Sequence, residues 1–356
     1  MSLSVSSWES KNVLAPSSNP HVVQLEMLIH SVVVVSASSY NLGGRLSSVG
    51  AESGGHFPGF KPHAIPLVGQ LQVDVYQHCY SRPFDSMVPD YVLNSDGAEG
   101  FGRLLSDANL GHDRMEPGWH IESLLPGGRV LARKGEAMRT LWPGEFTAPG
   151  TRGMPPAIGT AINILASRES WTVQAGYYYA FGEAITDEQD DHDLVRFYWD
   201  IESAGAPVLL RQITQVLNRF EIPFRFKCQA LPAAYVRTDA AVLFVSRRYC
   251  HLVGELLAGV WQRVTQHMRP ETPLFTKRLA LGLGLAEEPR TGESFGMHRC
   301  RLVAEGMWAA FKEGDNSEHG RLRRVMANFA QSGVDVEHPY LNARSTDVYD
   351  WAWLRE

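Results

Sequence analysis

Hydrophobic and polar residues alternate most clearly between residues 222 and 228, where the sequence reads IPFRFKC. A period of two is the pattern of a β-strand with one apolar face. Its phase puts the two phenylalanines and Cys228 on one face, and Arg225 and Lys227 on the other. Two cations on one strand face repel each other and lose hydration unless an anion lies near them. This strand therefore predicts a surface that faces an anion.

Other segments predict further strands and several helices. Residues 195–201 (VRFYWDI) and 233–245 (AAYVRTDAAVLFV) are rich in β-branched and aromatic residues, which is typical of strands. The second of these strands would carry Tyr235, Arg237 and Asp239 on one face. A hydrophobic period near 3.6 predicts helices over residues 67–80, 207–220, 252–268, 297–312 and 322–330.

The first half of the chain is less regular. Short apolar groups between residues 118 and 146 are separated by Pro-Gly turns and predict a small β-meander, and residues 171–181 predict a strand. Residues 1–60 are rich in Ser and Gly, which predicts a poorly ordered extension. The acidic run 187–193 lacks the ligand spacing of a metal-binding loop, and we interpret it as a solvated loop.

Together these elements predict an α+β fold, with a mixed or antiparallel sheet and packed helices. We expect one large compact domain over residues 61–356. Within it, residues 61–190 would form an N-terminal part, and residues 191–356 a basic part that carries the site.

Composition excludes several classes of protein. With 44% hydrophobic and 20% charged residues the chain is typical of globular proteins. Its four cysteines are far apart and show no CxxC spacing, which argues against a zinc site and a disulfide framework. No basic segment leads into an apolar core at the N-terminus, and the apolar run 28–35 is too short to span a bilayer. We therefore expect a cytoplasmic protein with no membrane partner.

Charge is distributed unevenly along the chain. The net charge of −6 suggests no nucleic-acid partner. Between Arg196 and Arg301, however, 15 Lys and Arg face 9 Asp and Glu, whereas the rest of the chain holds 18 against 30. This segregation indicates an anion-binding region in an otherwise acidic protein, although solvated arginines that cluster by chance would give the same count. Arg237 could extend the Arg225 and Lys227 surface, or it could simply pair with Asp239.

The segment GESFGMHRC (292–300) offers a second candidate for anion binding. Ser294 is a natural helix N-cap, and backbone N–H groups at a helix start face any bound anion. His298 and Arg299 would lie in or near the first turn. The same residues match the G-x-S-x-G pattern of serine hydrolases, which would make Ser294 a nucleophile. That motif needs a strand directly before it, and the preceding AEEPRT is a poor strand.

Several segments resemble the HopA-type effector domain family, from about residue 67 to the end of the chain. This family includes type III effectors of plant pathogens and the lyase component of class V lanthipeptide and thioamitide biosynthesis. The segments that carry the resemblance are VDVYQHCYSRPF, EPGWHI, VRFYWDI, IPFRFKC, YVRTDAAVLFV, PLFTKRLALGLGLAEEP, ESFGMHRC and HPYLNA.

The resemblance implies a lyase that removes phosphate from phosphorylated Ser or Thr of a leader-bearing precursor peptide, after a separate kinase-like protein has phosphorylated it. Dehydroalanine or dehydrobutyrine would remain. In that reaction Lys227 could remove the Cα proton and His298 could protonate the leaving phosphate. The candidates for binding phosphate are Arg196, Arg225, Arg237, Lys277 and Arg299. Elimination needs no cofactor or metal, and we expect none. The alternative is an effector-like module that binds a protein without catalysis.

Overall fold

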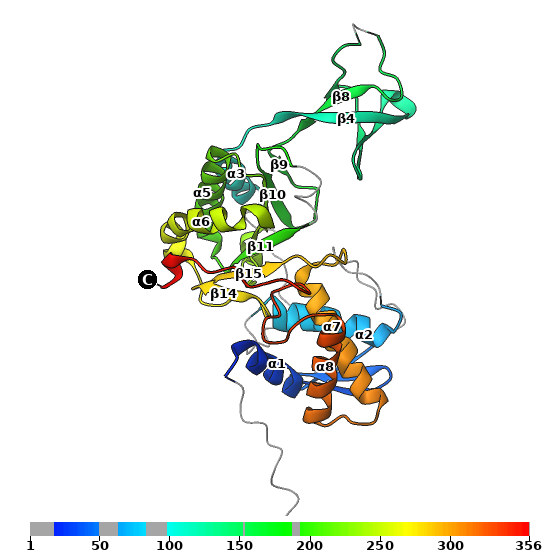
Figure 1. Ribbon diagram of the computed structural model, residues 1–356, viewed down its shortest axis with the longest axis vertical. Helices are drawn as coiled ribbons and strands as arrows, with labels where there is room; N and C mark the ends of the chain where they lie inside the picture. The colour runs from blue at the N-terminus through cyan, green and yellow to red at the C-terminus, as the bar shows by residue number, and fades with distance from the viewer. Residues whose placement is uncertain (1–17, 50–62, 83–97, 152–153, 187–192, 356) are drawn as a thin grey trace, which may run out of the picture.

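The computed structural model describes residues 18–49, 63–82, 98–151, 154–186 and 193–355 (Figure 1). Helices pack against three antiparallel sheets, which confirms the predicted α+β class. The helices are α1 (Pro20–Ser31), α2 (Pro66–Val75), α3 (Ala98–Ala108), α5 (Ala206–Arg219), α6 (Cys250–Val264), α7 (Phe295–Lys312) and α8 (Glu318–Gln331). A π-helical turn, Tyr76–Tyr80, continues α2. All five predicted helices are therefore present, with ends that differ by a few residues.

A seven-stranded sheet forms the centre of the molecule. Its strands run in the order β14-β15-β11-β13-β12-β10-β9, and each is antiparallel to its neighbours. Residues of the central strands β11 and β13 are buried on both faces. The strands are β9 (Glu169–Ser170), β10 (Tyr177–Phe181), β11 (Leu194–Trp199), β12 (Phe224–Gln229), β13 (Ala241–Ser246), β14 (Lys277–Ala280) and β15 (Leu283–Glu287).

Two groups of helices accompany this sheet (Figure 1). The helices α3, α5 and α6 lie together in one group, and α1, α2, α7 and α8 form the other. Helix α5 begins with a proline in its first turn and buries the residues at helical spacing that face the core, among them Leu210, Ile213 and Leu217. The apolar face of β12, with Phe224, Phe226 and Cys228, belongs to the same hydrophobic core.

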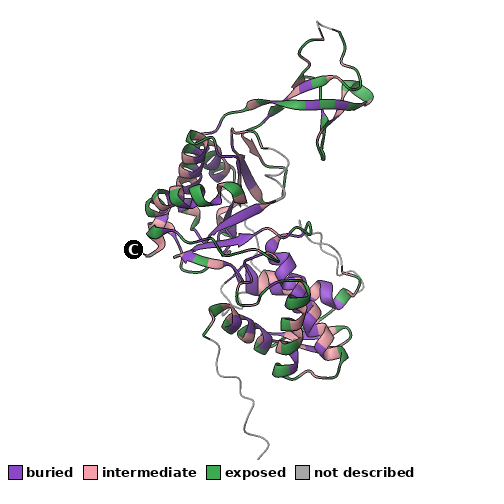
Figure 2. Ribbon diagram, in the orientation of Figure 1, coloured by how far each residue is buried: buried purple, intermediate pink, exposed green. Residues whose placement is uncertain are grey.

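A five-stranded sheet stands apart from this core (Figure 2). Its strands are β4 (Arg114–Leu124), β5 (Val130–Lys134), β6 (Ala137–Leu141), β7 (Phe146–Thr147) and β8 (Ala161–Ala166), and they include the predicted β-meander. Its own small core is a separate cluster built around Trp119, Ile121 and Ile164. Among the described residues, the buried apolar side chains form two clusters, and the single domain over residues 61–356 stays a prediction.

The prediction of a poorly ordered extension is wrong for residues 18–49. Helix α1 is followed by a three-stranded sheet of β1 (Val32–Ser36), β2 (Ser39–Leu42) and β3 (Arg45–Ser48). Leu28 and Ile29 of α1 and Val32 of β1 are buried in the main core, because the apolar run 28–35 supplies the face of a helix and then a strand. Residues 1–17 and 50–60 of the predicted extension lie outside the described residues, as does most of the acidic run 187–193.

The strand predicted over residues 233–245 exists only from Ala241 to Ser246. The preceding residues form a loop, in which Thr238 donates to the backbone carbonyls of Ser81 and Tyr80, at 2.9 and 3.2 Å. This loop is therefore anchored to the π-helical turn and not to a neighbouring strand. Two short strands, β14 and β15, were not predicted, because the glycines in this stretch interrupt the pattern typical of a strand.

Candidate functional site

The candidate site lies on one face of the seven-stranded sheet. Arg225 of β12 lies opposite Phe244 of β13, and Phe244 lies opposite Arg196 of β11. Paired residues of antiparallel strands project to the same face. Lys227 follows Arg225 by two positions and projects there as well. The register thus confirms that Arg225 and Lys227 share a face, and it adds Arg196 to them.

The Phe244 ring lies among these three cations. The guanidinium carbons of Arg196 and Arg225 lie 4.8 and 5.7 Å from the ring centroid, and Lys227 Nζ lies 5.9 Å from it. A cation over an aromatic face is attracted by the ring quadrupole, most strongly where water is excluded. Contact with the Phe244 ring therefore offsets part of the electrostatic repulsion among the three cations.

Lys227 is held between aromatic rings and an amide. Its Nζ donates to Gln174 Oε1 at 3.1 Å and lies 4.4 Å from the centroid of the Tyr177 ring. Burial, and after it the charge of the nearby Arg196, lower the pKa of Lys227 from 10.5 to about 7, against a smaller opposing effect of Asp239. A lysine with this pKa is largely neutral in mildly alkaline solution and can accept a proton.

Arg237 approaches the same face from the loop before β13. Its guanidinium donates to both carboxylate oxygens of Asp239, at 2.7 and 2.9 Å. It also donates to the Tyr76 hydroxyl at 3.1 Å. Both alternatives from the sequence thus hold: Arg237 pairs with Asp239, and it also lies near enough to Lys227 to affect its pKa.

Arg196 has a carboxylate partner of its own. Its guanidinium forms an ion pair with Glu288, which follows directly on β15. The four cations Arg196, Arg225, Lys227 and Arg237, with Glu288 and Asp239, are called the sheet-face cluster below. Among these six described residues, the basic groups outnumber the carboxylates, even when Lys227 is neutral. Such a surface favours an anion with more than one charge.

His298 and Arg299 are buried residues of α7 whose hydrogen bonds run to other partners, although Arg299 lies close enough to Glu288 for that carboxylate to raise its pKa. Arg299 is fully buried and donates to the carbonyls of Pro339 and Leu341, at 2.7 and 2.9 Å. Its guanidinium also lies 2.7 Å from His298 Nδ1. Burial, with Arg299 and Arg301 beside it, lowers the pKa of His298 to about 3. The structure thus makes Arg299 an anchor for the C-terminal segment, and it keeps His298 neutral.

Lys277 is separated from the cluster. It forms an ion pair with Asp347, with Nζ 2.6 Å from the carboxylate. Its strand partner is Leu285, which lies opposite Phe197 and therefore on the sheet face away from Arg196. The structure does not bring Lys277 together with the other predicted phosphate ligands.

Ser294 caps α7, as the sequence predicted. Its Oγ accepts from the backbone N–H of Met297 at 3.4 Å. Strand β15 ends at Glu287, so a loop separates it from the helix. A nucleophile elbow requires a sharp turn directly from strand to helix. The geometry therefore argues against a hydrolase that uses Ser294.

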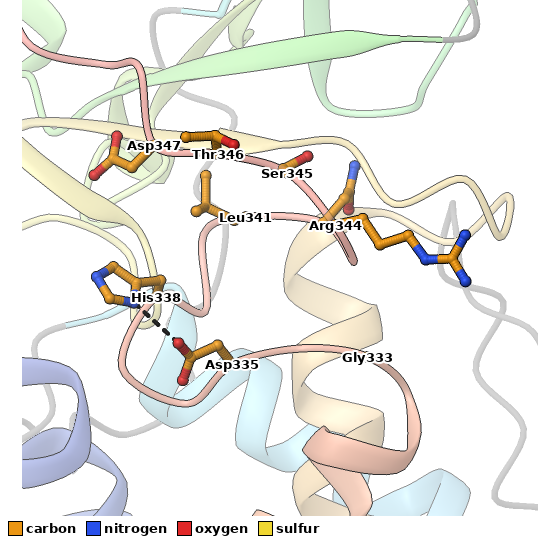
Figure 3. A pocket seen from close by; sticks show the side chains of 9 residues that line it. Gly333, Asp335, His338, Leu341, Arg344, Ser345, Thr346 and Asp347 are labelled. Atoms are coloured by element: carbon orange, nitrogen blue, oxygen red, sulfur yellow. Dashed lines mark hydrogen bonds and ion pairs between the residues drawn. The ribbon is translucent and has the colours of Figure 1, made fainter.

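A hollow of about 340 Å³ lies in the C-terminal segment (Figure 3). It is lined by residues between Gly333 and Asp347, including an ion pair of Asp335 and His338 at 3.0 Å. It shares no residue with the sheet-face cluster. Within the described residues, no group of three or more His, Cys, Asp or Glu side chains could hold a metal ion. Among the helices described, none is long and apolar enough to cross a membrane.

Comparison with known proteins finds one family model that matches the segment holding the sheet face. The model of the HopA1 effector protein family matches residues 169–341. This is just under half of the chain, and it contains all six residues of the sheet-face cluster. The resemblance seen in the sequence is confirmed to this extent.

Two solved structures are similar at a distance. An effector protein from Pseudomonas syringae pv. tomato strain DC3000 matches with a TM-score of 0.43 and 16% identity, covering 76% of this chain and 90% of that one. One from Pseudomonas syringae pv. syringae strain 61 matches with a TM-score of 0.42 and 17% identity, covering 78% and 90%.

A mitochondrial succinate dehydrogenase assembly factor 2 of Debaryomyces hansenii is 30% identical over 88 residues, or 24% of this chain. The chain spans 59% of the length of that relative.

Sequence reasoning missed four residues at the site: Tyr76, Gln174, Phe244 and Glu288. Phe244 could have been found, because it lies in a predicted strand whose register with β12 places it beside Arg225. The other three reach the cluster from other segments through tertiary packing. No local pattern in the sequence marks them.

Proposed function

We propose that the protein is a lyase that removes phosphate from phosphorylated Ser or Thr in a peptide. The observation that carries this proposal is Lys227, a lysine with a pKa near 7 set among arginines on one sheet face. A base beside a cationic anion site is what β-elimination of phosphate requires. The match of this segment to an effector family is consistent with the proposal but does not by itself assign an activity.

In this reaction the neutral amine of Lys227 removes the Cα proton. The electron pair of that C–H bond forms the Cα–Cβ double bond, and the Cβ–O bond breaks. Phosphate leaves toward the arginines, which neutralise its charge. Arg196 and Arg237 are each paired with a carboxylate in the present structure, and a phosphate dianion would compete for the same donors. The product is dehydroalanine or dehydrobutyrine.

The substrate in this proposal is a leader-bearing precursor peptide, and a separate kinase-like protein supplies its phosphate. The chain's own residues provide an acceptor surface for phosphate, and elimination needs no redox cofactor. The proposal therefore includes another protein that phosphorylates the peptide before this one acts on it.

The experiment is to incubate the protein with a phosphothreonine peptide and follow the loss of phosphoric acid by mass spectrometry. Lys227→Met should lower the elimination rate by about 10²- to 10⁴-fold, the usual contribution of a positioned base. Lys277→Met is the matched control, because that lysine is also half-buried but lies on the other sheet face. Equal rates for wild type and Lys227→Met would refute the role of Lys227.

A second candidate is an effector-like module that binds a phosphorylated protein without catalysis. The description of the matching family, an effector protein family, favours it. The same cations would then hold the phosphate, and Lys227 would serve only as a ligand. Tight binding of the phosphopeptide, with its mass unchanged after prolonged incubation, would decide for the binding module.

A further inference from the structure

Tyr76 lies beside the sheet-face cluster and contacts Arg237 from the π-helical turn. It is the first residue of the π-helical turn Tyr76–Tyr80, and such turns are frequent at functional sites. Its hydroxyl accepts from Arg237 at 3.1 Å and donates its proton to Asp239 Oδ2 at 3.4 Å. The Arg237 guanidinium also lies 5.5 Å from the centroid of the Tyr76 ring. The phenol therefore points at one of the cations proposed to bind phosphate.

The ring of Tyr76 is held firmly in this position. It stacks on Tyr80, with centroids 5.1 Å apart and planes inclined by 15°. Both rings lie against Gly296 at the start of α7, where an added Cβ would come within 2.6 Å of Tyr80 and 2.7 Å of Tyr76. The loop that holds Arg237 is tied to the same turn through Thr238 and Tyr80. The hydroxyl and the guanidinium are thus positioned by one connected unit.

The chemistry of elimination calls for a proton donor. A phosphate dianion that leaves without a proton would depart with three negative charges, which is unfavourable. The sequence suggested His298 for this step. The structure instead places His298 against Arg299, buried and neutral.

We infer that Tyr76 is the general acid of the elimination, an inference that rests on the proposed function. As Lys227 takes the Cα proton and the Cβ–O bond breaks, the Tyr76 hydroxyl gives its proton to the bridging oxygen. Hydrogen phosphate leaves, and the tyrosinate is stabilised by Arg237. The Lys227 ammonium then returns a proton to Tyr76 through solvent, so the cycle consumes no other reactant.

The surroundings suit a donor of this kind. Burial, and after it the charge of Asp239, raises the pKa of Tyr76 well above its usual value of 10. The phenol therefore stays protonated until a strongly basic oxygen appears next to it, as happens when phosphate begins to leave. Arg237 acts in the opposite direction and limits the cost of the phenolate.

The test compares wild type with Tyr76→Phe, which keeps the ring stack and removes only the hydroxyl. On a phosphothreonine peptide we expect kcat to fall by about 10²-fold with KM changed by less than about threefold, in the range of general acid catalysis. On the same peptide with S-phosphorylated cysteine the loss should shrink to a few-fold, because thiophosphate is a weaker base than phosphate and depends less on a proton donor as it leaves. Tyr178→Phe is the control, since its hydroxyl bonds to Asn109 and Glu169 on the other sheet face.

Each outcome decides a different point. Equal loss on the two leaving groups would overturn the role of Tyr76 as an acid, and so would full activity of Tyr76→Phe on the phosphothreonine peptide. Thermal unfolding of Tyr76→Phe and Tyr178→Phe shows whether either variant loses activity by unfolding. If the wild type eliminates neither leaving group, the proposed function itself fails, and the inference fails with it.

Discussion

At the scale of single residues, Lys227 shows how burial and charge act together. Within the described part of the chain, its Nζ donates to Gln174 and lies near the aromatic rings of Tyr177 and Phe244. Aromatic rings attract a cation but cannot replace the water molecules that it loses on burial. The cost of desolvation therefore exceeds the attraction, and the charged ammonium form of Lys227 is disfavoured. Arg196 adds a like charge nearby, which lowers the pKa further. The surroundings of Lys227 thus lower its pKa enough for part of it to be the neutral amine that a base must be.

The pH dependence of elimination follows from the pKa of Lys227, about 7 in the free protein. Only the neutral amine accepts a proton, so kcat/KM should rise with pH through about 7 and then become constant. Arg196→Gln should move this inflection upward by on the order of one unit, because a like charge is removed and Glu288 is left unpaired. The measurement is kcat/KM between pH 5.5 and 9.5. An inflection that does not move in Arg196→Gln would contradict this account of the shift.

The residues of the site differ in how far the sequence could predict them. Arg225 and Lys227 were predictable because a period of two fixes their face wherever the strand packs. Arg237 was assigned to a strand because AAYVRTDAAVLFV is β-prone throughout, whereas hydrogen bonds from Thr238 to the π-helical turn hold it in a loop. Gln174 and Tyr76 come from segments 53 and about 150 residues away from Lys227. Their contribution depends on tertiary contacts that no local pattern contains.

At the scale of elements, the start of α7 has a different role from the one its sequence suggested. The glycines and serine of GESFG indicated a site for an anion. Ser294 does cap the helix, but Gly296 makes room for Tyr76 and Tyr80. Arg299, one turn further on, holds the C-terminal segment through two carbonyls. The helix was predictable from its period, whereas the burial of its first turns was not, because basic residues are usually exposed.

Gly296→Ala tests this role of α7. The new Cβ would lie within 2.7 Å of both tyrosine rings, so we expect a loss of about 1–3 kcal/mol in unfolding free energy, as for other overpacked sites. Displacement of Tyr76 should also lower the rate of elimination.

Gly259→Ala in α6 is the matched control, since nothing lies within 4 Å of its added Cβ. That variant should gain about 0.5–1 kcal/mol from helix propensity. Chemical denaturation gives both values, and a neutral effect of Gly296→Ala would show that the tyrosine pair is loosely packed.

At the scale of the whole molecule, the two hydrophobic clusters stabilise different parts of the described chain. The main core supports the sheet face, with its strands, both helix groups and the C-terminal segment. The five-stranded sheet has its own core and is inserted between α3 and β9. Its first and last strands leave the main body side by side, with Arg114 opposite Ala166, and Arg168 N–H donating to Asp113 at 2.8 Å. A segment that enters and leaves at one point can be removed without changing the path of the remaining chain.

We therefore expect the main core to fold without the five-stranded sheet. Replacing residues 115–165 by Asn-Gly would join Arg114 to Ala166 through a two-residue hairpin turn, which suits an antiparallel pair. The shortened chain should unfold in one cooperative transition, with Tm within about 5 °C of the main transition of the full chain. It should also eliminate phosphate from a short phosphothreonine peptide at a similar rate, because no residue of the sheet-face cluster is removed.

Ile164→Asp is the matched perturbation, as it places a charge in the small core alone. If the shortened chain fails to fold and Ile164→Asp also lowers the Tm of the main transition, the small sheet supports the main core directly, and the two clusters form one cooperative unit.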